Sequence, residues 1–227
     1  MAAILIHDTT IVTADEAGSI LYDAALVVRD GRIAALGPTT ELIARYPDSE
    51  RVDGRGRAIL PGLANTHTHL SRVLARGIYE DNMAEDMIEV MRTALFMERV
   101  RRQDGRRPTP EEVLTWATRN GYRALGIPDG GWLAPGNRAD LIAIDLRKPH
   151  LTPALRVVSC LVHQGQVSDV EAVMVDGRWI MRDRCVVTLD EAAIVAEADR
   201  IARAAWRRLF EHRPGLPRPP GLDVGTR

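Results

Sequence analysis

The chain has 227 residues, and its 30 Lys and Arg against 31 Asp and Glu leave a formal net charge of −1. This balance excludes the broad positive field typical of nucleic-acid-binding proteins, and no segment approaches the roughly 20 apolar residues of a membrane span. A composition of 45% hydrophobic and 27% charged residues is that of an ordinary globular protein. Because we see no signal peptide and only two cysteines, with no CxxC pair, we expect a cytoplasmic protein.

The first sixty residues predict β-structure. An apolar-rich run over 4–12 is followed by two more runs, 24–29 and 32–37, on either side of Asp30-Gly31. An Asp-Gly pair between apolar runs is a strong hairpin signal, because a type I′ turn needs positive φ at both central residues. A short helix over 39–45, capped by its first threonine, is expected next.

The same pattern returns late in the chain. Asp176-Gly177 separates the runs 169–175 and 178–181, and 139–145 predicts a further strand. The simplest interpretation is one β unit assembled from both ends of the chain, with helices between.

Three helices are predicted outside this β unit. The segment 84–102 carries a methionine-rich apolar stripe at helical spacing, which is typical of core. A second helix begins with Thr109 as N-cap and Pro110 at its first position, and ends at Gly126. A last helix spans about 189–211, and the proline- and glycine-rich tail after it is expected to be disordered.

A pair of histidines carries the chemistry. His67 and His69 lie two residues apart after an apolar run. On a strand, residues i and i+2 point to the same face, so the two imidazoles would form half of a metal site. A His-x-His pair taken alone is more often exposed or satisfied by other partners, so the surrounding segments must decide.

Those segments, in this order, resemble the amidohydrolase superfamily, closest to its branch of cytosine deaminases, chlorohydrolases and adenosyl deaminases. The matching segments are Asp30-Gly31-Arg32-Ile33, Ile59-Leu60-Pro61-Gly62-Leu63, His67-Thr68-His69, Leu74-Ala75-Arg76-Gly77, Asp81-Asn82 with Asp86-Met87, Gly121 to Leu125, Pro135-Gly136 through Ala139-Asp140-Leu141, and Ser168-Asp169-Val170 through Asp176-Gly177. Such proteins place a (β/α)₈ barrel between the two halves of a β-sandwich.

The resemblance implies a chemistry as well as a fold. It makes His67 and His69 the metal ligands of the first barrel strand, and Asp81 a ligand that also accepts the proton of the attacking water. The metal would be zinc, or another divalent metal such as iron. The reaction would be hydrolysis of a non-peptide carbon–nitrogen bond, that is deamination or dechlorination of a small heterocyclic substrate.

The chain departs from the family between these ligands. His69 and Asp81 are only 81 − 69 = 12 positions apart, so barrel strands two to seven, two further histidine ligands and the proton-shuttling glutamate have no counterpart. Glu80 and Glu85 are the nearest carboxylates that could replace that glutamate.

We therefore predict an α+β fold, a β-sandwich built from both chain ends with a truncated remnant of a TIM barrel between. The two sandwich halves are expected at 1–60 and 135–188, and the barrel remnant at 61–134. The C-terminal helix is expected at 189–212 and the disordered tail at 213–227.

Two functional hypotheses stay open. The chain is a metal-dependent hydrolase, or it is a catalytically incomplete remnant or shortened form that acts only as a folded or oligomerising module. Apolar helix faces without barrel partners predict a homo-oligomer.

Overall fold

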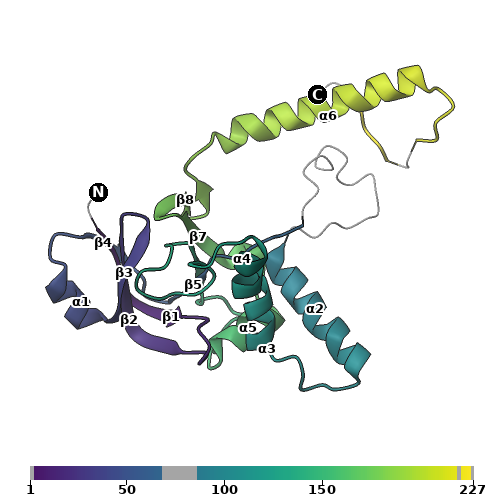
Figure 1. Cartoon of the computed structure of the whole chain (residues 1–227). Coiled ribbons are helices and arrows are strands. Elements are labelled where there is room, and N and C mark those ends of the chain that lie inside the picture. The colour runs from purple at the N-terminus through teal and green to yellow at the C-terminus, as the bar shows by residue number, and fades with distance from the viewer. Residues whose placement is uncertain (1–2, 68–85, 219–220, 226–227) are drawn as a thin grey trace. The chain divides into compact units, whose positions relative to one another are not determined.

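The computed structural model describes residues 3–67, 86–218 and 221–225, and it is drawn in Figure 1. The chain forms two compact units: one comprises Met1–Thr66 and Ala84–Val187, the other His67–Met83 and Thr188–Arg227. The strands are β1 (Ile4–Val12), β2 (Ile20–Arg29), β3 (Arg32–Pro38), β4 (Glu50–Asp53), β5 (Arg57–Pro61), β6 (Leu141–Asp145), β7 (Val170–Val175), β8 (Arg178–Arg182) and β9 (Cys185–Val186). The helical segments are α1 (Thr39–Arg45), α2 (Met87–Arg102), α3 (Pro110–Thr115), η2 (Trp116–Asn120), α4 (Gly121–Ala124), α5 (Val157–Gln164), η3 (Val167–Asp169) and α6 (Glu191–His212).

The strands of the first unit form one mixed sheet that draws on both parts of the chain. Its order is β3-β2-β1-β5-β6-β7-β8-β9, and β4 pairs with β1 in parallel. The two parts meet where β5 pairs with β6 in antiparallel register, from Arg57 opposite Asp145 to Pro61 opposite Leu141. The prediction of one β unit assembled from segments distant in sequence is confirmed.

Both Asp-Gly turns have the predicted conformation. Asp30 and Gly31 have φ of 51° and 77°, and Asp176 and Gly177 have φ of 49° and 72°. Each pair closes a two-residue hairpin, β2 to β3 and β7 to β8. A third such turn, Asp183-Arg184, joins β8 to β9 and was not predicted.

The sheet folds back on itself, so that the two Asp-Gly turns touch. A Cβ added at Gly177 would lie 2.7 Å from the Cα of Gly31. Ala139 lies between the two hairpins, since its N–H donates to the Gly31 carbonyl and its carbonyl accepts from the Gly177 N–H. The space enclosed by the folded sheet is filled by one apolar core from β1, β2, β3, β5, β6 and β7: Ile6, Ile11, Leu26, Val28, Ile33, Ile59, Leu141, Ala143 and Met174.

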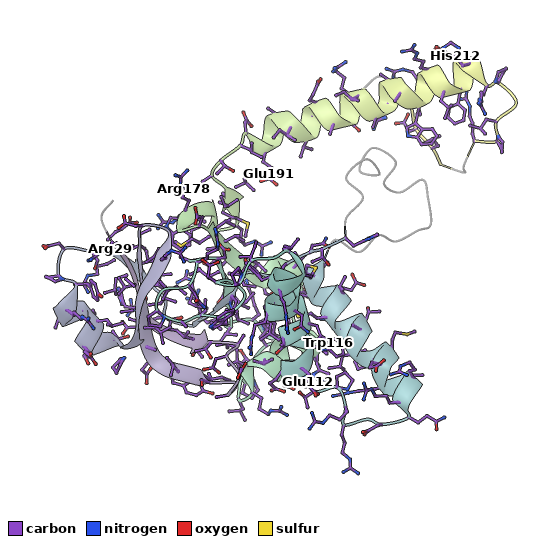
Figure 2. All side chains as sticks on the ribbon, in the orientation of Figure 1. Arg29, Glu112, Trp116, Arg178, Glu191 and His212 are labelled. Atoms are coloured by element: carbon purple, nitrogen blue, oxygen red, sulfur yellow. The ribbon has the colours of Figure 1, made fainter. Side chains whose placement is uncertain are left out.

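The opposite face of β5 and β6 is covered by helices. Ala58, Leu60, Ile142 and Ile144 point to this side, because successive residues of a strand face opposite sides of the sheet. They pack against apolar residues of α2, α3 and α5, among them Met91, Leu95, Leu114 and Leu161. Side chains fill the layer between the sheet and these helices (Figure 2). The predicted core role of the methionine-rich helix thus holds for one of its faces, whereas Val90, Met97 and Val100 on the same helix are exposed.

The second predicted helix is observed with one irregularity. The Thr109 hydroxyl caps it by accepting from the Glu112 N–H, and the Glu112 carboxylate accepts from the Thr109 N–H, which completes a capping box. α3, η2 and α4 then follow without a break, and η2 is a π-helical turn. Gly126 follows the helix with a φ of +72°, as expected for a glycine after a helix end.

One local prediction was wrong. Pro38, not Thr39, is the N-cap of α1, and the Thr39 hydroxyl accepts from the Asp8 N–H instead. In the second unit, Arg203 pairs with Asp223 and the Arg218 guanidinium lies over the Phe210 ring. The disorder expected for the tail 213–227 stays a prediction. Within the described part of the chain, no helix is long and apolar enough to span a membrane.

Candidate metal centre

The segment that leads to the histidine pair leaves the sheet at the end of β5. Ala58, Ile59 and Leu60 of this strand are almost fully buried. Beyond Pro61, the Gly62 N–H donates to the Asp140 carbonyl at 2.9 Å, and the Ala64 N–H donates to the Ala117 carbonyl at 2.8 Å. Two backbone hydrogen bonds therefore hold the exit segment 62–66, one to the start of β6 and one to the π-helical turn.

Two glycines permit this close packing. A Cβ at Gly62 would lie 3.0 Å from the Tyr122 hydroxyl, and a Cβ at Gly121 would lie 2.7 Å from the Ala64 Cβ. These distances are tighter than ordinary carbon contacts. The glycine at each position lets the exit segment lie directly on α4.

Tyr122 and Asp140 form a buried polar pair beneath the exit segment, which we call the Tyr122–Asp140 clamp. The Tyr122 hydroxyl donates to Asp140 Oδ2 at 3.0 Å, and Asp140 Oδ1 accepts from the Asp176 N–H at 2.6 Å. Burial, and then the neighbouring Asp140 carboxylate, raise the pKa of Tyr122. Asp140 therefore ties α4 to the second Asp-Gly turn. An acid directly before the apolar run of β6 was the sequence signal for this role, but the role was not predicted.

The predicted metal ligands are only partly within the described structure. His67 follows the held segment directly and is exposed. His69 and Asp81, together with Glu80, Glu85 and the Leu74–Gly77 motif, lie outside the described residues. No group of three or more His, Cys, Asp or Glu side chains within the described ranges could hold a metal ion. The three residues proposed as ligands thus stay a prediction.

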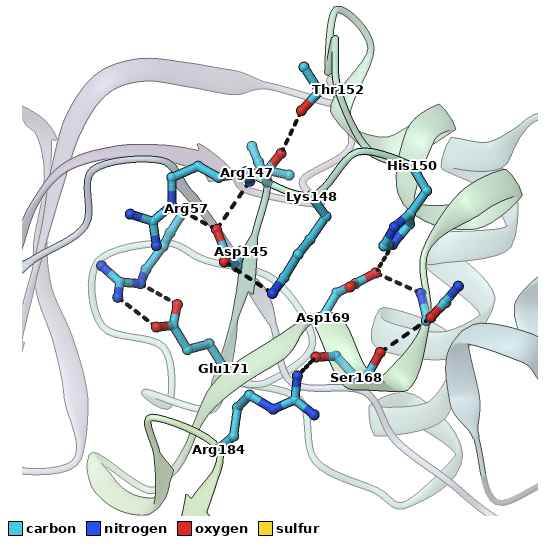
Figure 3. A network of polar contacts seen from close by, with 12 residues as sticks. Arg57, Asp145, Arg147, Lys148, His150, Thr152, Ser168, Asp169, Glu171 and Arg184 are labelled. Atoms are coloured by element: carbon cyan, nitrogen blue, oxygen red, sulfur yellow. Dashed lines mark hydrogen bonds and ion pairs between the residues drawn. The ribbon is translucent and has the colours of Figure 1, made fainter.

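Another histidine is engaged in a separate polar network between β5, β6 and β7 (Figure 3). His150 Nε2 lies 2.8 Å from Asp169 Oδ2, and Asp169 is buried. Arg57 of β5 donates twice to the Glu171 carboxylate, at 2.5 and 2.7 Å, and this pairing lowers the pKa of Glu171. These contacts stabilise the packing of the sheet and leave His150 committed to a partner within the first unit.

Comparisons with known proteins identify a family domain within the chain. Residues 77–180 match the amidohydrolase family, and residues 24–48 match an imidazolonepropionase-like composite domain of bacteria. The chain carries an amidohydrolase-family domain. The match begins four residues before Asp81, at Gly77, and runs through the second Asp-Gly hairpin.

The curated relatives of this chain are named as deaminases. A 5-methylthioadenosine/S-adenosylhomocysteine deaminase of Pelotomaculum thermopropionicum is 36% identical over 177 residues, which cover 76% of this chain and 40% of the relative. A 5'-deoxyadenosine deaminase of Methanosarcina mazei is 39% identical over 124 residues, covering 55% of this chain and 28% of that protein. This chain thus spans 40% of the length of the first of these relatives.

Solved structures agree on the fold. A zinc-bound adenosine deaminase from Xanthomonas campestris superposes with a TM-score of 0.84 at 15% identity, covering 91% of this chain and 99% of that one. A zinc complex of the atrazine chlorohydrolase TrzN from Arthrobacter aurescens gives a TM-score of 0.69 at 13% identity, covering 88% and 100%. At such identities the likeness concerns the fold, a mixed sheet with helices.

Proposed function

We propose that the chain is the metal-binding part of a hydrolase that removes an amino group from a small heterocycle. One observation carries the proposal: in the sequence, the His67-Thr68-His69 pair directly follows segment 62–66, which two backbone hydrogen bonds hold within the first unit. A metal site needs such a held backbone, because ligands must keep their geometry. Similarity to deaminases of adenine-containing substrates over 76% of the chain favours deamination over dechlorination.

The donor set fits a divalent metal. Two imidazoles from His67 and His69 and one carboxylate from Asp81 form a three-ligand set of the kind that catalytic zinc accepts, with a position left for water. Zinc or iron bound there would lower the pKa of that water toward neutrality. His67 and His69 would hold the metal, and Asp81 would both bind it and accept a proton from the attacking water at a carboxylate oxygen.

We also propose the finer organisation. The folded-over sheet is the β-sandwich of an amidohydrolase, formed by 1–60 and 135–188, and 61–134 is the remnant of its barrel. Support comes from the contact between the two Asp-Gly turns and from the core that the sheet encloses. The free thiols of Cys160 and Cys185 favour the cytoplasm. The exposed Val90, Met97 and Val100 favour a homo-oligomer.

The test combines metal content and turnover. The chain is purified with zinc, bound metal is measured by mass spectrometry, and ammonia release is followed with 5'-deoxyadenosine, 5-methylthioadenosine and S-adenosylhomocysteine. We expect one zinc per chain, lost in His67→Ala with His69→Ala and in Asp81→Ala. The matched control is His212→Ala, since His212 is an exposed residue at the end of α6.

Two outcomes would contradict the proposal. A wild-type protein without stoichiometric metal would refute the site. Ammonia release that persists in the double histidine variant would show that the reaction does not use these ligands.

A further inference from the structure

A cavity lies in the first unit, among residues 115–132. Its volume is about 550 Å³, within the range of small-molecule sites. It is lined by Thr115, Arg119, Asn120, Arg123, Gly126, Ile127, Pro128 and Trp132. One side is the π-helical turn with the end of α4, and the other is the loop that leads to β6.

The π-helical turn forms the basic side of the cavity. Arg119 and Asn120 belong to this turn, and Arg123 follows one turn later on α4. Residues four apart lie on the same face of a helix, so the two guanidinium groups come from one face. π-Helical turns inside α-helices are frequent at functional sites.

A close backbone contact sets the opposite wall. Gly131, with a φ of +85°, lies so near the helix that an added Cβ would be 2.8 Å from the Cα of Arg119. The next residue is Trp132, and the Arg119 guanidinium lies 5.6 Å from the centre of its ring. The side chain of Asn137 holds this wall by donating to the Trp132 carbonyl. The indole is thus placed beside the arginines by packing that only glycine allows.

The charge of the lining is positive. Two arginines and no carboxylate contribute to it. Arg119 donates to Glu16 at 2.9 Å, but the Glu16 side chain is 88% exposed, so this pair is a weak one in solvent. For Arg123, no ion pair is found within the described ranges of the chain. The cavity therefore combines one uncompensated guanidinium, a second that is weakly paired, amide and hydroxyl groups, and an aromatic wall.

We propose that this cavity binds a small organic anion that carries a planar ring, of the size of a nucleoside monophosphate. Arg123 and Arg119 contact the phosphate, because guanidinium groups donate in pairs to its oxygens. Trp132 packs against the ring, as aromatic side chains do with bases. Asn120 and Thr115 donate to or accept from polar groups at the edge of the ring. This site requires neither a metal nor the histidine pair.

The experiment measures binding by calorimetry on the full chain in EDTA, with AMP, adenosine and inorganic phosphate as probes. AMP should bind at least tenfold more tightly than either fragment. Arg123→Gln should weaken AMP about tenfold and leave adenosine unchanged, because one charge-assisted contact is lost. Trp132→Leu should weaken AMP and adenosine together. Arg106→Gln, at an exposed arginine outside the lining, is the matched control, and His67→Ala with His69→Ala should keep AMP affinity.

Several outcomes would overturn the proposal. An AMP affinity equal to that of phosphate would show that the indole does not contribute to binding. If Arg123→Gln keeps the thermal midpoint of the wild type and also keeps its AMP affinity, the arginine does not contact the phosphate. AMP binding lost in the double histidine variant would place the ligand at the metal centre instead. Because EDTA removes any metal, failure of the hydrolase proposal does not affect these results.

Discussion

Asp140→Ala is expected to destabilise the chain strongly, because one carboxylate satisfies two separate donors. The substitution removes the acceptors of the Tyr122 hydroxyl, at 3.0 Å, and of the Asp176 N–H, at 2.6 Å. A buried donor without a partner costs about 1–3 kcal/mol. Tyr122 is only 8% exposed, whereas Asp176 lies on an exposed turn where water can reach its N–H. The cost therefore falls mainly on Tyr122, and we expect the free energy of unfolding to drop by about 1–3 kcal/mol.

The assay is urea unfolding followed by circular dichroism, with Asp48→Ala as control because Asp48 is exposed on a loop. The control should change the free energy of unfolding by less than about 0.5 kcal/mol. Tyr122→Phe should cost about 1 kcal/mol, and the double variant should cost less than the sum, since both changes remove the same hydrogen bond. Additive losses, or an Asp140→Ala variant as stable as the control, would refute the clamp.

The clamp also predicts a dependence on alkaline pH. Burial and the Asp140 carboxylate raise the pKa of Tyr122 above its ordinary value of 10.0. The protonated hydroxyl is favoured in the folded state, so its contribution is complete below about pH 10 and is lost as the pH rises toward the folded pKa. Wild-type stability should therefore fall more steeply above about pH 10 than that of Tyr122→Phe. Parallel curves for the two proteins would contradict this assignment.

Three further predictions concern local stability. Gly177→Ala should lower the free energy of unfolding by about 1–3 kcal/mol, because its Cβ would stand 2.7 Å from the Cα of Gly31. Thermal unfolding measures this loss, and Gly215→Ala is the control because a Cβ there meets nothing within 4 Å. Glu171→Gln should cost about 1.5–3 kcal/mol at pH 7, since it breaks the paired hydrogen bonds from Arg57. Because Arg57 lowers the pKa of Glu171, wild-type stability should fall as the pH drops through that folded pKa, and the variant should show a flatter urea-midpoint profile. Thr109→Ala should cost about 1 kcal/mol by loss of the capping box, a value that urea unfolding can check; no change would mean that the cap adds nothing.

The exit segment shows where prediction from sequence stopped. The histidine pair was found from its spacing, and the strand before it from its apolar run. That Gly62 and Ala64 would donate to Asp140 and Ala117 could not be predicted, because these partners lie 78 and 53 positions away along the chain (140 − 62 and 117 − 64). Their contact depends on how β5 and β6 pair and on where α4 packs.

The failed cap of α1 has a similar cause. Thr39 has the right residue type and position for an N-cap, yet its hydroxyl accepts from Asp8, 31 positions earlier. A local preference worth about 1 kcal/mol is easily outweighed when a neighbouring strand presents an unpaired N–H. Thr109 has no such competitor, and its cap formed as predicted.

The sequence by itself determined the two Asp-Gly turns, the cap at Thr109 and the strands β5 and β6. Each of these depends on the conformational preferences of a few adjacent residues. Only the tertiary structure decided that the two Asp-Gly turns touch, that Asp140 joins Tyr122 to Asp176, and that Gly131 places Trp132 beside Arg119. Those contacts join residues far apart in the chain, and their geometry exists only once the sheet has folded over its core.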